Sequence, residues 1–452
     1  MGVLWRDKKV TKRLEIFKYS LYVAFPLIFG YGLGRTPEFW ERAQELLPSA
    51  AQNPHGPYLP KEVTEHRPTL HTEFQKLRLE AALDAALAEA KETNSKAGNM
   101  GKKIRALVTG GSGFLGQHVV RQLVETGKYE VTIFDIREGA YKSADVTTIV
   151  GDLRKPESVA DACKGMQVVF HVATAAPTGA NAINKDLMDG VNVKGTENVV
   201  AACVACGVPK LVLTSSASVV FDGHRLDMVS EACPYAVKPM DYYTQTKIAG
   251  EKIVLAANGK GGLATCSLRP SGIFGEGDPL FVPTVVKNAR KGKMKFIIGG
   301  GTNEMDFTYV GNVAQAHLQA ADALSLDSPL AGKAYFITNQ APRRFWDMMG
   351  DVCEGLEYPR PSLKLPLGLI MFFAAFFEYV VFPLVSKFKK IETDFTVNRI
   401  LLASTHRTFS AAAAKRDFGY VPRVGMADAL ARTVEHFAYL RKSAVDAKAK
   451  DQ

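Results

Sequence analysis

Glycines at positions 110, 113 and 116 constrain this chain more than any other feature. They follow a β-branched segment, Ile104–Thr109, and precede a helix-forming segment, Gln117–Val124. A strand, a glycine turn and a helix in this order can receive a pyrophosphate on the helix N-terminus. Gly110 allows the tight turn, Gly113 lets the backbone approach the phosphates, and Gly116 lets the helix pack closely on the strand. The pattern therefore predicts a dinucleotide-binding unit.

The next predicted strand, Glu130–Phe134, is followed by a carboxylate. Asp135 lies 135 − 116 = 19 residues after the third glycine, close to the ~20-residue spacing at which an acidic side chain binds the adenosine ribose hydroxyls. A carboxylate repels a 2′-phosphate, so the sequence favours NAD. Arg137, two residues on, keeps NADP open as the alternative.

Two further turns are predicted beside the cofactor. Asp152 follows the short strand Thr147–Val150 and is placed to meet the adenine. The strand Val168–Val172 leads into a turn of small residues that includes Ala173 and would pass beside the cofactor. His171 is interpreted as a packed core histidine without a chemical role.

A serine, a tyrosine and a lysine predict a hydride-transfer site. The strand Lys210–Leu213 leads into a serine-rich turn containing Ser216, and Tyr243 and Lys247 stand four residues apart in a helical pattern. Four residues place tyrosine and lysine on one helix face. The lysine is expected to lower the tyrosine pKa from ~10. The tyrosinate would then take a hydroxyl proton as hydride leaves, while Ser216 holds the substrate oxygen.

From residue 102 onward, short β-branched segments alternate with helical periods. This predicts an α/β fold with a doubly wound parallel sheet of the Rossmann type. We expect a membrane-anchor segment in residues 1–60 and a helical linker in 61–101. An NAD-binding core with the catalytic residues is expected in 102–345, with substrate-region elements interleaved from about 270. A smaller C-terminal substrate-binding and membrane-associated region is expected in 346–452.

Two apolar runs have basic flanks. Tyr19–Leu33 follows six lysines and arginines within the first 18 residues, which is typical of a signal anchor. A cleaved signal peptide and a buried helix are the alternatives. Leu365–Val385 is followed by Lys387, Lys389 and Lys390, which is typical of a segment that lies on or re-enters a membrane. A helix covering a substrate pocket is the alternative.

The net charge of +10 is interpreted mainly as membrane-facing charge. No motif accompanies it that would indicate nucleic-acid binding. Cys203 and Cys206 have a Cys-x-x-Cys spacing without a second pair, so no metal site is predicted.

Five segments carry a family resemblance. Together with the glycine turn and Asp135, they resemble the extended short-chain dehydrogenase/reductase superfamily, and within it the 3β-hydroxysteroid dehydrogenases. The likeness is greatest to the decarboxylating sterol-4α-carboxylate 3-dehydrogenases. The segments are Leu213–Val219, Tyr235–Lys247, Arg269–Gly275, Lys291–Gly299 and Asp306–Val310, and the resemblance spans about Lys103 to Arg441.

The resemblance implies roles for individual residues. Ser216, Tyr243 and Lys247 would be catalytic, and the late segment would form a lid and sterol pocket. Arg269 and Pro270 would lie beside the nicotinamide. The motifs and the resemblance together give the expected cofactor-binding residues: Gly110, Gly113, Phe114, Leu115, Gly116, Asp135, Arg137, Asp152, Leu153, Ala173, Tyr243, Lys247, Arg269 and Pro270.

The implied reaction is oxidation, by NAD, of a sterol 3β-hydroxyl beside a C4 carboxylate. The β-keto acid that results loses CO₂ without a separate decarboxylase residue, because the departing electrons enter the new carbonyl as an enol. The implied partners are the sterol and membrane lipid at the endoplasmic reticulum. A homodimer, and contacts of residues 1–60 with membrane proteins, are compatible with this reading. A related enzyme acting on a nucleotide sugar is the alternative, which the apolar Leu365–Val385 disfavours.

Residues 14–48 carry a second, weaker resemblance. Leu14–Pro26, Glu38–Glu41 and Leu46–Pro48 are similar to the Pet-one-hundred family of mitochondrial cytochrome c oxidase assembly factors. This would imply the mitochondrial inner membrane, and a structural or assembly subunit of a respiratory complex that retains a dehydrogenase fold. The complete set of Ser216, Tyr243 and Lys247 argues against a domain that has lost its activity.

Overall fold

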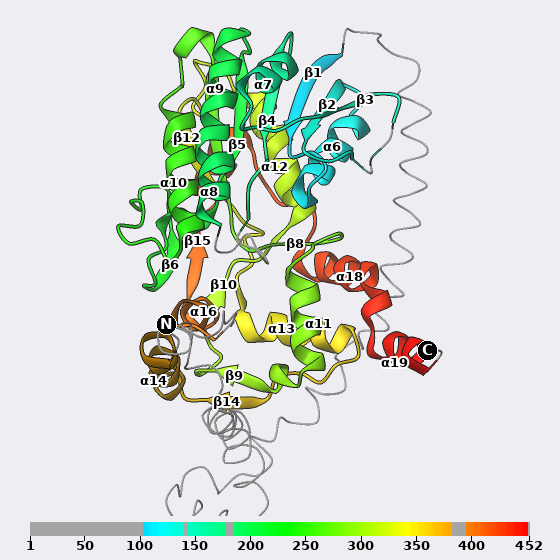
Figure 1. Cartoon of the computed structure of the whole chain (residues 1–452), viewed down its shortest axis with the longest axis vertical. Helices are drawn as coiled ribbons and strands as arrows, with labels where there is room; N and C mark the ends of the chain where they lie inside the picture. Colours follow the sequence, from blue (N-terminus) through cyan, green and yellow to red (C-terminus); the bar gives the residue numbers. More distant parts are fainter. Residues whose placement is uncertain (1–102, 140, 142, 177–183, 382–394, 451–452) are drawn as a thin grey trace, which may run out of the picture. The chain divides into compact units, whose positions relative to one another are not determined.

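The computed structural model describes residues 103–139, 141, 143–176, 184–381 and 395–450 (Figure 1). Its main element is a parallel sheet in the order β12-β7-β5-β4-β1-β2-β3. The strands are β1 (Ile104–Thr109), β2 (Tyr129–Asp135), β3 (Val146–Val150), β4 (Val168–His171), β5 (Lys210–Thr214), β7 (Ala264–Pro270) and β12 (Lys333–Ile337). The predicted Rossmann-type sheet is confirmed. Its order reverses between β1 and β4, where open α/β sheets bind ligands.

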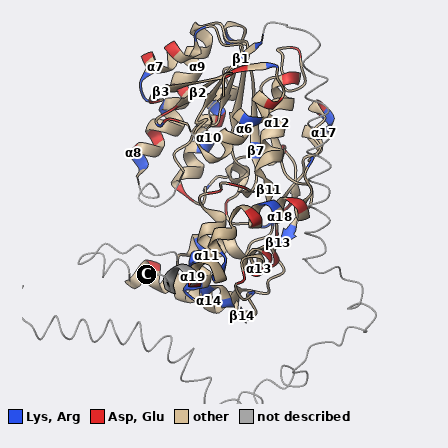
Figure 2. Cartoon of the chain, turned by 90° about the vertical axis from the view of Figure 1, so that its right-hand side faces the viewer, with Lys and Arg blue, Asp and Glu red and all other residues tan. Residues whose placement is uncertain are grey.

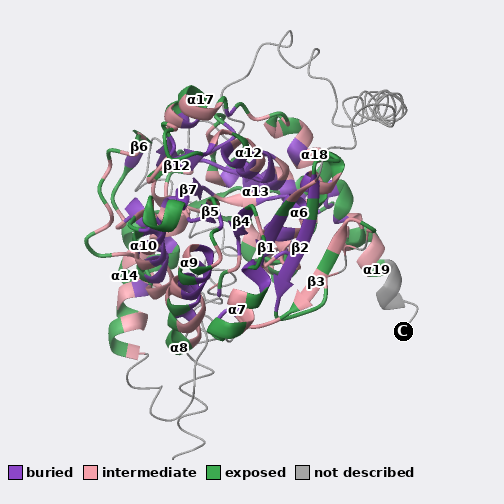
Figure 3. Ribbon diagram, turned by 90° about the horizontal axis from the view of Figure 1, so that it is seen from above, coloured by how far each residue is buried: buried purple, intermediate pink, exposed green. Residues whose placement is uncertain are grey.

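Helices cover both faces of this sheet (Figures 1 and 3). α6 (Phe114–Glu125) and α12 (Val310–Ala323) pack together on one face, and α7 (Pro156–Cys163), α9 (Gly195–Ala205) and α10 (Tyr242–Leu255) lie on the other. In α6 the buried side chains Leu115, Val119 and Leu123 recur every four residues, which puts them on one stripe facing the sheet. Outer helices such as α7, α8 (Lys185–Met188) and α17 (Ala412–Phe418) carry charged residues (Figure 2).

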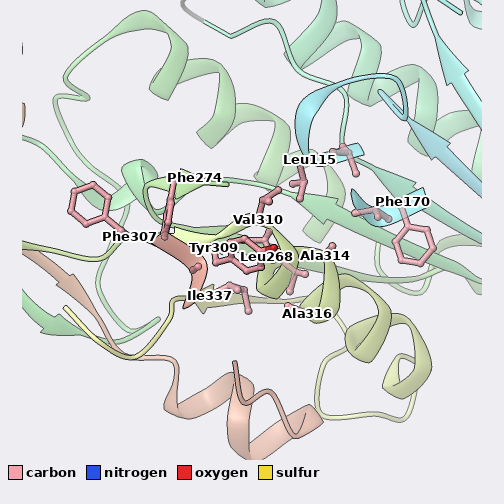
Figure 4. Packing of buried hydrophobic residues seen from close by; sticks show 14 of the residues in the cluster. Leu115, Phe170, Leu268, Phe274, Phe307, Tyr309, Val310, Ala314, Ala316 and Ile337 are labelled. Carbon is pink, nitrogen blue, oxygen red and sulfur yellow. The ribbon is translucent and has the colours of Figure 1, made fainter. Parts of the chain in front are cut away.

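An aromatic cluster joins the sheet to the C-terminal region (Figure 4). The short strand β8 (Ile273–Phe274) pairs with β11 (Thr308–Tyr309) just beyond the carboxyl end of β7. Phe274 meets Phe307 edge to face, with ring centroids 6.5 Å apart, and meets Tyr309 at 6.2 Å. These rings belong to the main hydrophobic core, so the two parts share one packed interior.

The C-terminal region is assembled from distant stretches of chain. Its four-stranded sheet has the order β13-β10-β15-β6. The strands are β6 (Leu226–Val229), β10 (Glu304–Met305), β13 (Arg343–Arg344) and β15 (Arg407–Phe409), and β9 (Phe296–Ile298) pairs separately with β14 (Leu363–Leu365). The helices are α11 (Phe281–Arg290), α13 (Phe345–Gly355), α14 (Leu367–Phe376), α16 (Val397–Ser404), α18 (Met426–His436) and α19 (Lys442–Lys450). β6 and β15 pair although α10, β7 and β12 lie between them in sequence.

The first part of the apolar run Leu365–Val385 forms α14 and the π-helical turn η7 (Phe377–Val381). α14 is largely exposed (Figure 3), with Phe372 64% exposed. No helix in the described part of the chain combines the length and apolar character needed to cross a bilayer. The predicted anchor and linker in residues 1–101 lie outside the described residues, as does the end of the run from residue 382.

Candidate active site

The glycine turn between β1 and α6 is too tight for side chains at two of its three glycines. Gly110 has a φ of +71°, and a Cβ added to it would lie 2.6 Å from the Cα of Ala173. A Cβ on Gly116 would overlap the carbonyl oxygen of Gly110. α6 begins at Phe114 without a side-chain cap and without an acidic residue in its first turn. Its first N–H groups, including that of Leu115, have no helical acceptor, so the turn fits the pyrophosphate of a dinucleotide.

Asp135 borders this turn as the last residue of β2. Its buried carboxylate accepts hydrogen bonds from the backbone N–H of Ser112 (3.1 Å) and of Arg137 (3.2 Å). The carbonyl oxygen of Asp135 accepts the N–H of Gly151 at 2.8 Å, which brings the ends of β2 and β3 together. The predicted ribose-binding carboxylate thus lies beside the predicted phosphate loop.

Asp152 and Leu153 follow β3 at the same edge. The carboxylate of Asp152 forms an ion pair with Arg154 (2.6 Å), which holds the pKa of Asp152 below its usual value. Leu153 is buried, and its carbonyl oxygen accepts a hydrogen bond from Asn198 at 2.8 Å. If Asp152 binds the adenine, its carboxylate therefore has to bind the adenine and the Arg154 guanidinium together.

The turn after β4 lies against the glycine turn. Ala173 packs against Gly110. His171 is buried between the hydroxyls of Thr109 (2.7 Å) and Thr196 (3.0 Å), and burial lowers its pKa to about 3. It is packed as the sequence predicts.

Hydrogen bonds join the predicted catalytic helix to the serine turn. α10 starts after Asp241, whose carboxylate caps the N–H of Thr244 (2.7 Å). The Nζ of Lys247 donates to the carbonyl oxygen of Thr214 (2.7 Å), the last residue of β5 and two residues before Ser216. The Thr244 hydroxyl also approaches the Ser218 hydroxyl at 3.4 Å. The structure thus brings Ser216 and the helix of Tyr243 and Lys247 to one edge of the sheet.

Burial dominates the electrostatics of this helix. It raises the pKa of Tyr243 to about 12, against a hydrogen bond with Thr174 that lowers it. It also lowers the pKa of Lys247 to about 8, against the nearby Glu251 carboxylate. The predicted depression of the Tyr243 pKa by Lys247 is therefore absent here, because the ammonium is bonded to Thr214 and desolvation disfavours the phenolate.

Arg269 is engaged elsewhere than at a cofactor. Its guanidinium forms a buried ion pair with Glu251 (2.6 Å) and lies against the rings of Tyr235 and Phe336. The expected place of Arg269 beside the nicotinamide stays a prediction, in which its backbone rather than its paired guanidinium would border the cofactor. Pro270 ends β7 at the carboxyl edge of the sheet, as expected.

Asn192 is a site residue that the motifs did not reveal. It lies buried in the π-helical turn η3 (Asp189–Lys194). Its amide accepts from Thr174 (3.1 Å) and from the N–H of Ala175 (2.7 Å), and donates to the hydroxyl of Thr246 (3.0 Å). It thereby fixes the turn after β4 to α10. An asparagine flanked by Val191 and Val193 in a helical stretch is the signal that could have indicated it.

Known families can now be compared with this geometry. Residues 107–367 match the model of the 3-beta hydroxysteroid dehydrogenase/isomerase family. The chain belongs to this family. It is 45% identical over 345 residues to a mouse sterol-4-alpha-carboxylate 3-dehydrogenase, decarboxylating, covering 76% of the chain and 94% of the relative. A yeast enzyme of the same description is 36% identical over 352 residues, covering 74% of the chain and 98% of the relative.

Solved structures share the fold at lower identity. MoeE5 in complex with UDP-glucose and NAD has a TM-score of 0.56 at 24% identity, covering 74% of this chain and 98% of that one. The epimerase Mth375 of Methanothermobacter thermautotrophicus has a TM-score of 0.60 at 20% identity, covering 76% and 95%. These likenesses support the Rossmann-type architecture.

Proposed function

We propose that the chain is an NAD-dependent sterol-4α-carboxylate 3-dehydrogenase that decarboxylates its product. One observation carries the proposal. Hydrogen bonds join the serine turn to the helix that carries Tyr243 and Lys247, in a chain 45% identical to the mouse enzyme of that description over 94% of its length.

The residues around the glycine turn would hold NAD. The first turn of α6 would bind the pyrophosphate, and Asp135 would accept the ribose hydroxyls while repelling a 2′-phosphate. Bound NAD would supply the hydride acceptor. Side chains of α10 and the serine turn would bind the substrate oxygen and transfer its proton.

Ser216 is prepared to donate to the substrate oxygen. Its hydroxyl oxygen accepts both the N–H (3.2 Å) and the hydroxyl (2.9 Å) of Ser218, which leaves its own proton free for the 3β-oxygen. The Oη of Tyr243 then receives the proton of that hydroxyl. Lys247 remains cationic at pH 7, because its pKa of about 8 lies above that pH. Its ammonium would have to turn from Thr214 toward the phenol to favour the phenolate that accepts this proton.

The second half of the reaction follows from the product. Oxidation beside the C4 carboxylate yields a β-keto acid, whose carbon–carbon bond to the carboxylate breaks as its electrons enter the C3 carbonyl. CO₂ leaves, and the resulting enolate takes up a proton at C4 to give the 3-ketosteroid. No further residue is required for this step.

An assay of the full-length chain tests the proposal. Purified protein with NAD and a 4α-carboxysterol is expected to form NADH, CO₂ and the 3-ketosteroid, while UDP-glucose is expected to give no NADH. Tyr243→Phe is expected to lower kcat by at least ~100-fold. The proposal fails if the wild-type chain forms no NADH with the carboxysterol, or if Tyr243→Phe leaves the rate unchanged.

We also propose that α14 and η7 lie against membrane lipid. Phe372 is 64% and Tyr379 70% exposed, and Lys364 before the helix is exposed as well. Exposed aromatic rings beside lysines suit a bilayer surface with anionic headgroups. Phe372→Asp should reduce cosedimentation with anionic vesicles, whereas Leu326→Asp, at an exposed site remote in sequence, should not. Equal vesicle binding of both variants would contradict this surface.

An intracellular membrane, the endoplasmic reticulum, is the location that accompanies this proposal. The mitochondrial and respiratory-complex alternative rests on residues 14–48, which lie outside the described residues. Two measurements on cells expressing the intact chain distinguish the reticulum from the mitochondrion. Fractionation shows in which membranes the chain resides. Comigration with cytochrome c oxidase on native gels would contradict a location in the reticulum.

A further inference from the structure

A cleft of about 210 Å³ between α6, α12 and the C-terminal segment around α18 is lined by three arginines. These helices lie close together on one side of the molecule (Figures 1 and 2). Arg121 comes from α6, Arg423 from the turn before α18, and Arg432 from α18 itself. None of the residues expected to bind the cofactor or to act on the substrate lines this cleft.

These three arginines have no anionic partner. Among the described residues none of them forms an ion pair with a carboxylate. Of the described residues that line the cleft, only Glu125 carries a carboxylate. Three guanidinium groups against one carboxylate leave the lining with a net charge of +2 at pH 7. Because cations placed together repel one another, the cleft favours an anionic ligand.

Two amides in the wall of the cleft are already bonded to the protein backbone. Asn312 donates to the carbonyl oxygen of Val424 (2.8 Å) and accepts its N–H (3.0 Å). Gln315 donates to the carbonyl oxygen of Val421 (2.8 Å) and accepts the N–H of Arg423 (3.2 Å). These bonds fix the backbone of Arg423 against α12. They leave the guanidinium N–H groups, which only donate, as the main donors for a ligand.

Two buried rings hold the other two arginines. The Nε2 of His118 donates to the carbonyl oxygen of Glu276 (2.9 Å), which leaves its Nδ1 to accept from the Nη2 of Arg121 at 3.4 Å. Burial lowers the pKa of His118, so the ring keeps this acceptor at pH 7. The guanidinium of Arg432 approaches the phenol of Tyr309, which donates to the Glu276 carboxylate at 3.0 Å. Both cations are thereby positioned at the cleft.

We propose that this cleft binds a small soluble phosphate monoester at a site separate from the dinucleotide. At pH 7 such an ester carries a charge close to −2, which balances the lining. Guanidinium groups bind phosphate oxygens through paired N–H donors. The volume of the cleft is many times the ~15 Å³ that one water needs, so a phosphoryl group fits together with part of its organic carrier. The site does not depend on the proposed dehydrogenase activity.

The position of the cleft gives the ligand a structural effect. α6 carries the predicted pyrophosphate turn at its N-terminus. α18 packs on α13 in the C-terminal region, since a Cβ added to Gly355 would lie 2.8 Å from Val434. An anion held by Arg121 and Arg432 together would bridge these two parts of the protein. Its binding should raise the midpoint of thermal unfolding, because a ligand that binds only the folded chain stabilises it.

Titration calorimetry of the full-length chain with glycerol 2-phosphate tests the site. Excess NAD is present, so that the glycine turn is filled and does not take the probe. The wild type should bind one equivalent of the ester and no glycerol. Arg423→Met and Arg432→Met should each weaken binding of the ester at least ~10-fold. Arg399→Met, at an exposed position of α16, is the matched control and should bind as the wild type does.

Glu125→Gln separates ligand binding from a structural role. It removes the carboxylate that opposes the anion, so it should tighten binding by roughly two- to fivefold, a gain that damage to the fold would not produce. Without the ester, the thermal midpoints of all variants should stay close to that of the wild type, because the substituted side chains are exposed. Absence of saturable binding to the wild type, or equal affinity in the wild type, Arg423→Met and Arg432→Met, would overturn the inference.

Discussion

The ammonium of Lys247 donates a hydrogen bond of 2.7 Å to the carbonyl oxygen of Thr214. The side chain of Thr214 is fixed in turn, because its hydroxyl bonds the buried Nε2 of His317 at 2.7 Å. His317 donates its Nδ1 proton to Val313 at 2.8 Å, so its Nε2 accepts from the threonine. Lys247, which we propose to be catalytic, is therefore oriented by the end of β5 and, through it, by α12.

Replacing this lysine should separate activity from stability. Lys247→Met is expected to lower kcat by at least ~100-fold while leaving the free energy of unfolding at pH 7 unchanged or higher. Burial lowers the Lys247 pKa to about 8 from 10.5, so the stability that this group contributes is fully present above pH 10.5 and lost as pH falls through 8. Steady-state kinetics measure kcat, and urea unfolding at pH 7 and pH 10 measures the free energy of unfolding. A variant clearly less stable than the wild type at pH 7 would contradict the expectation.

The glycine turn makes a sharper steric prediction. Gly116→Ala should abolish NAD binding and destabilise the chain, because its Cβ would overlap the Gly110 carbonyl. Gly425→Ala is the matched control at the start of α18, where a Cβ would meet nothing within 4 Å. Calorimetric titration with NAD and thermal unfolding provide the two readouts. Retained NAD affinity in Gly116→Ala would show that the turn can relax.

Asp135 should decide which dinucleotide is used. Asp135→Asn keeps an oxygen acceptor for Ser112 or Arg137 but removes the charge that repels a 2′-phosphate. The ratio of kcat/KM for NADP to that for NAD is expected to rise at least tenfold, an order of magnitude typical of one close charge contact. Steady-state kinetics with both dinucleotides test it. An unchanged ratio would assign the preference to another residue.

The buried ion pair beneath α10 should be costly to break. Glu251→Gln leaves the Arg269 guanidinium without its carboxylate at 2.6 Å and weakens the bonds to Tyr235 and Ser267. A loss of about 3–5 kcal/mol in the free energy of unfolding is expected. Glu435→Gln, which breaks an exposed pair with Arg441, should change little. Similar urea midpoints for the two variants would refute a structural role for this pair.

Asp306 should make stability depend on pH in the opposite sense to an ordinary carboxylate. Burial raises its pKa to about 7, above the unfolded value, so its contribution is fully present below about pH 4 and lost as pH rises through 7. Asp306→Asn keeps an acceptor for the N–H of Phe409 (2.7 Å) and should remove this loss. The free energy of unfolding should then fall less between pH 5 and 8 than in the wild type and in Asp327→Asn, at an exposed site. Identical pH profiles would contradict the assignment.

Local patterns predicted the dinucleotide half of the molecule well. β1 has the predicted bounds, and α6 starts at Phe114 rather than Gln117, because helical geometry begins directly after Gly113. Strand periodicity and glycine chemistry act over few residues, so sequence alone reveals them. The approach of Ser216 to the helix of Tyr243 follows from the same topology, since Ser216 follows the carboxyl end of β5 and Tyr243 lies in the first turn of α10.

Local patterns did not predict the contacts between residues that are distant in sequence. The sequence did not predict the partner of the Arg269 guanidinium, Glu251, which stands on another element. Asn192 bears no motif, and its partners come from the turn after β4 and from α10. Each of these side chains gets its environment from tertiary packing, which periodicity does not report.

The pairing of β15 with β6 and β10 has a consequence for the synthesis of the protein. β15 emerges from the ribosome near the end of the chain, whereas its neighbours begin at Leu226 and Glu304. The dinucleotide half can fold while translation continues. The sheet that borders the substrate edge has to wait for almost the last segment, so the nascent chain would be able to bind its coenzyme before it can recognise a substrate.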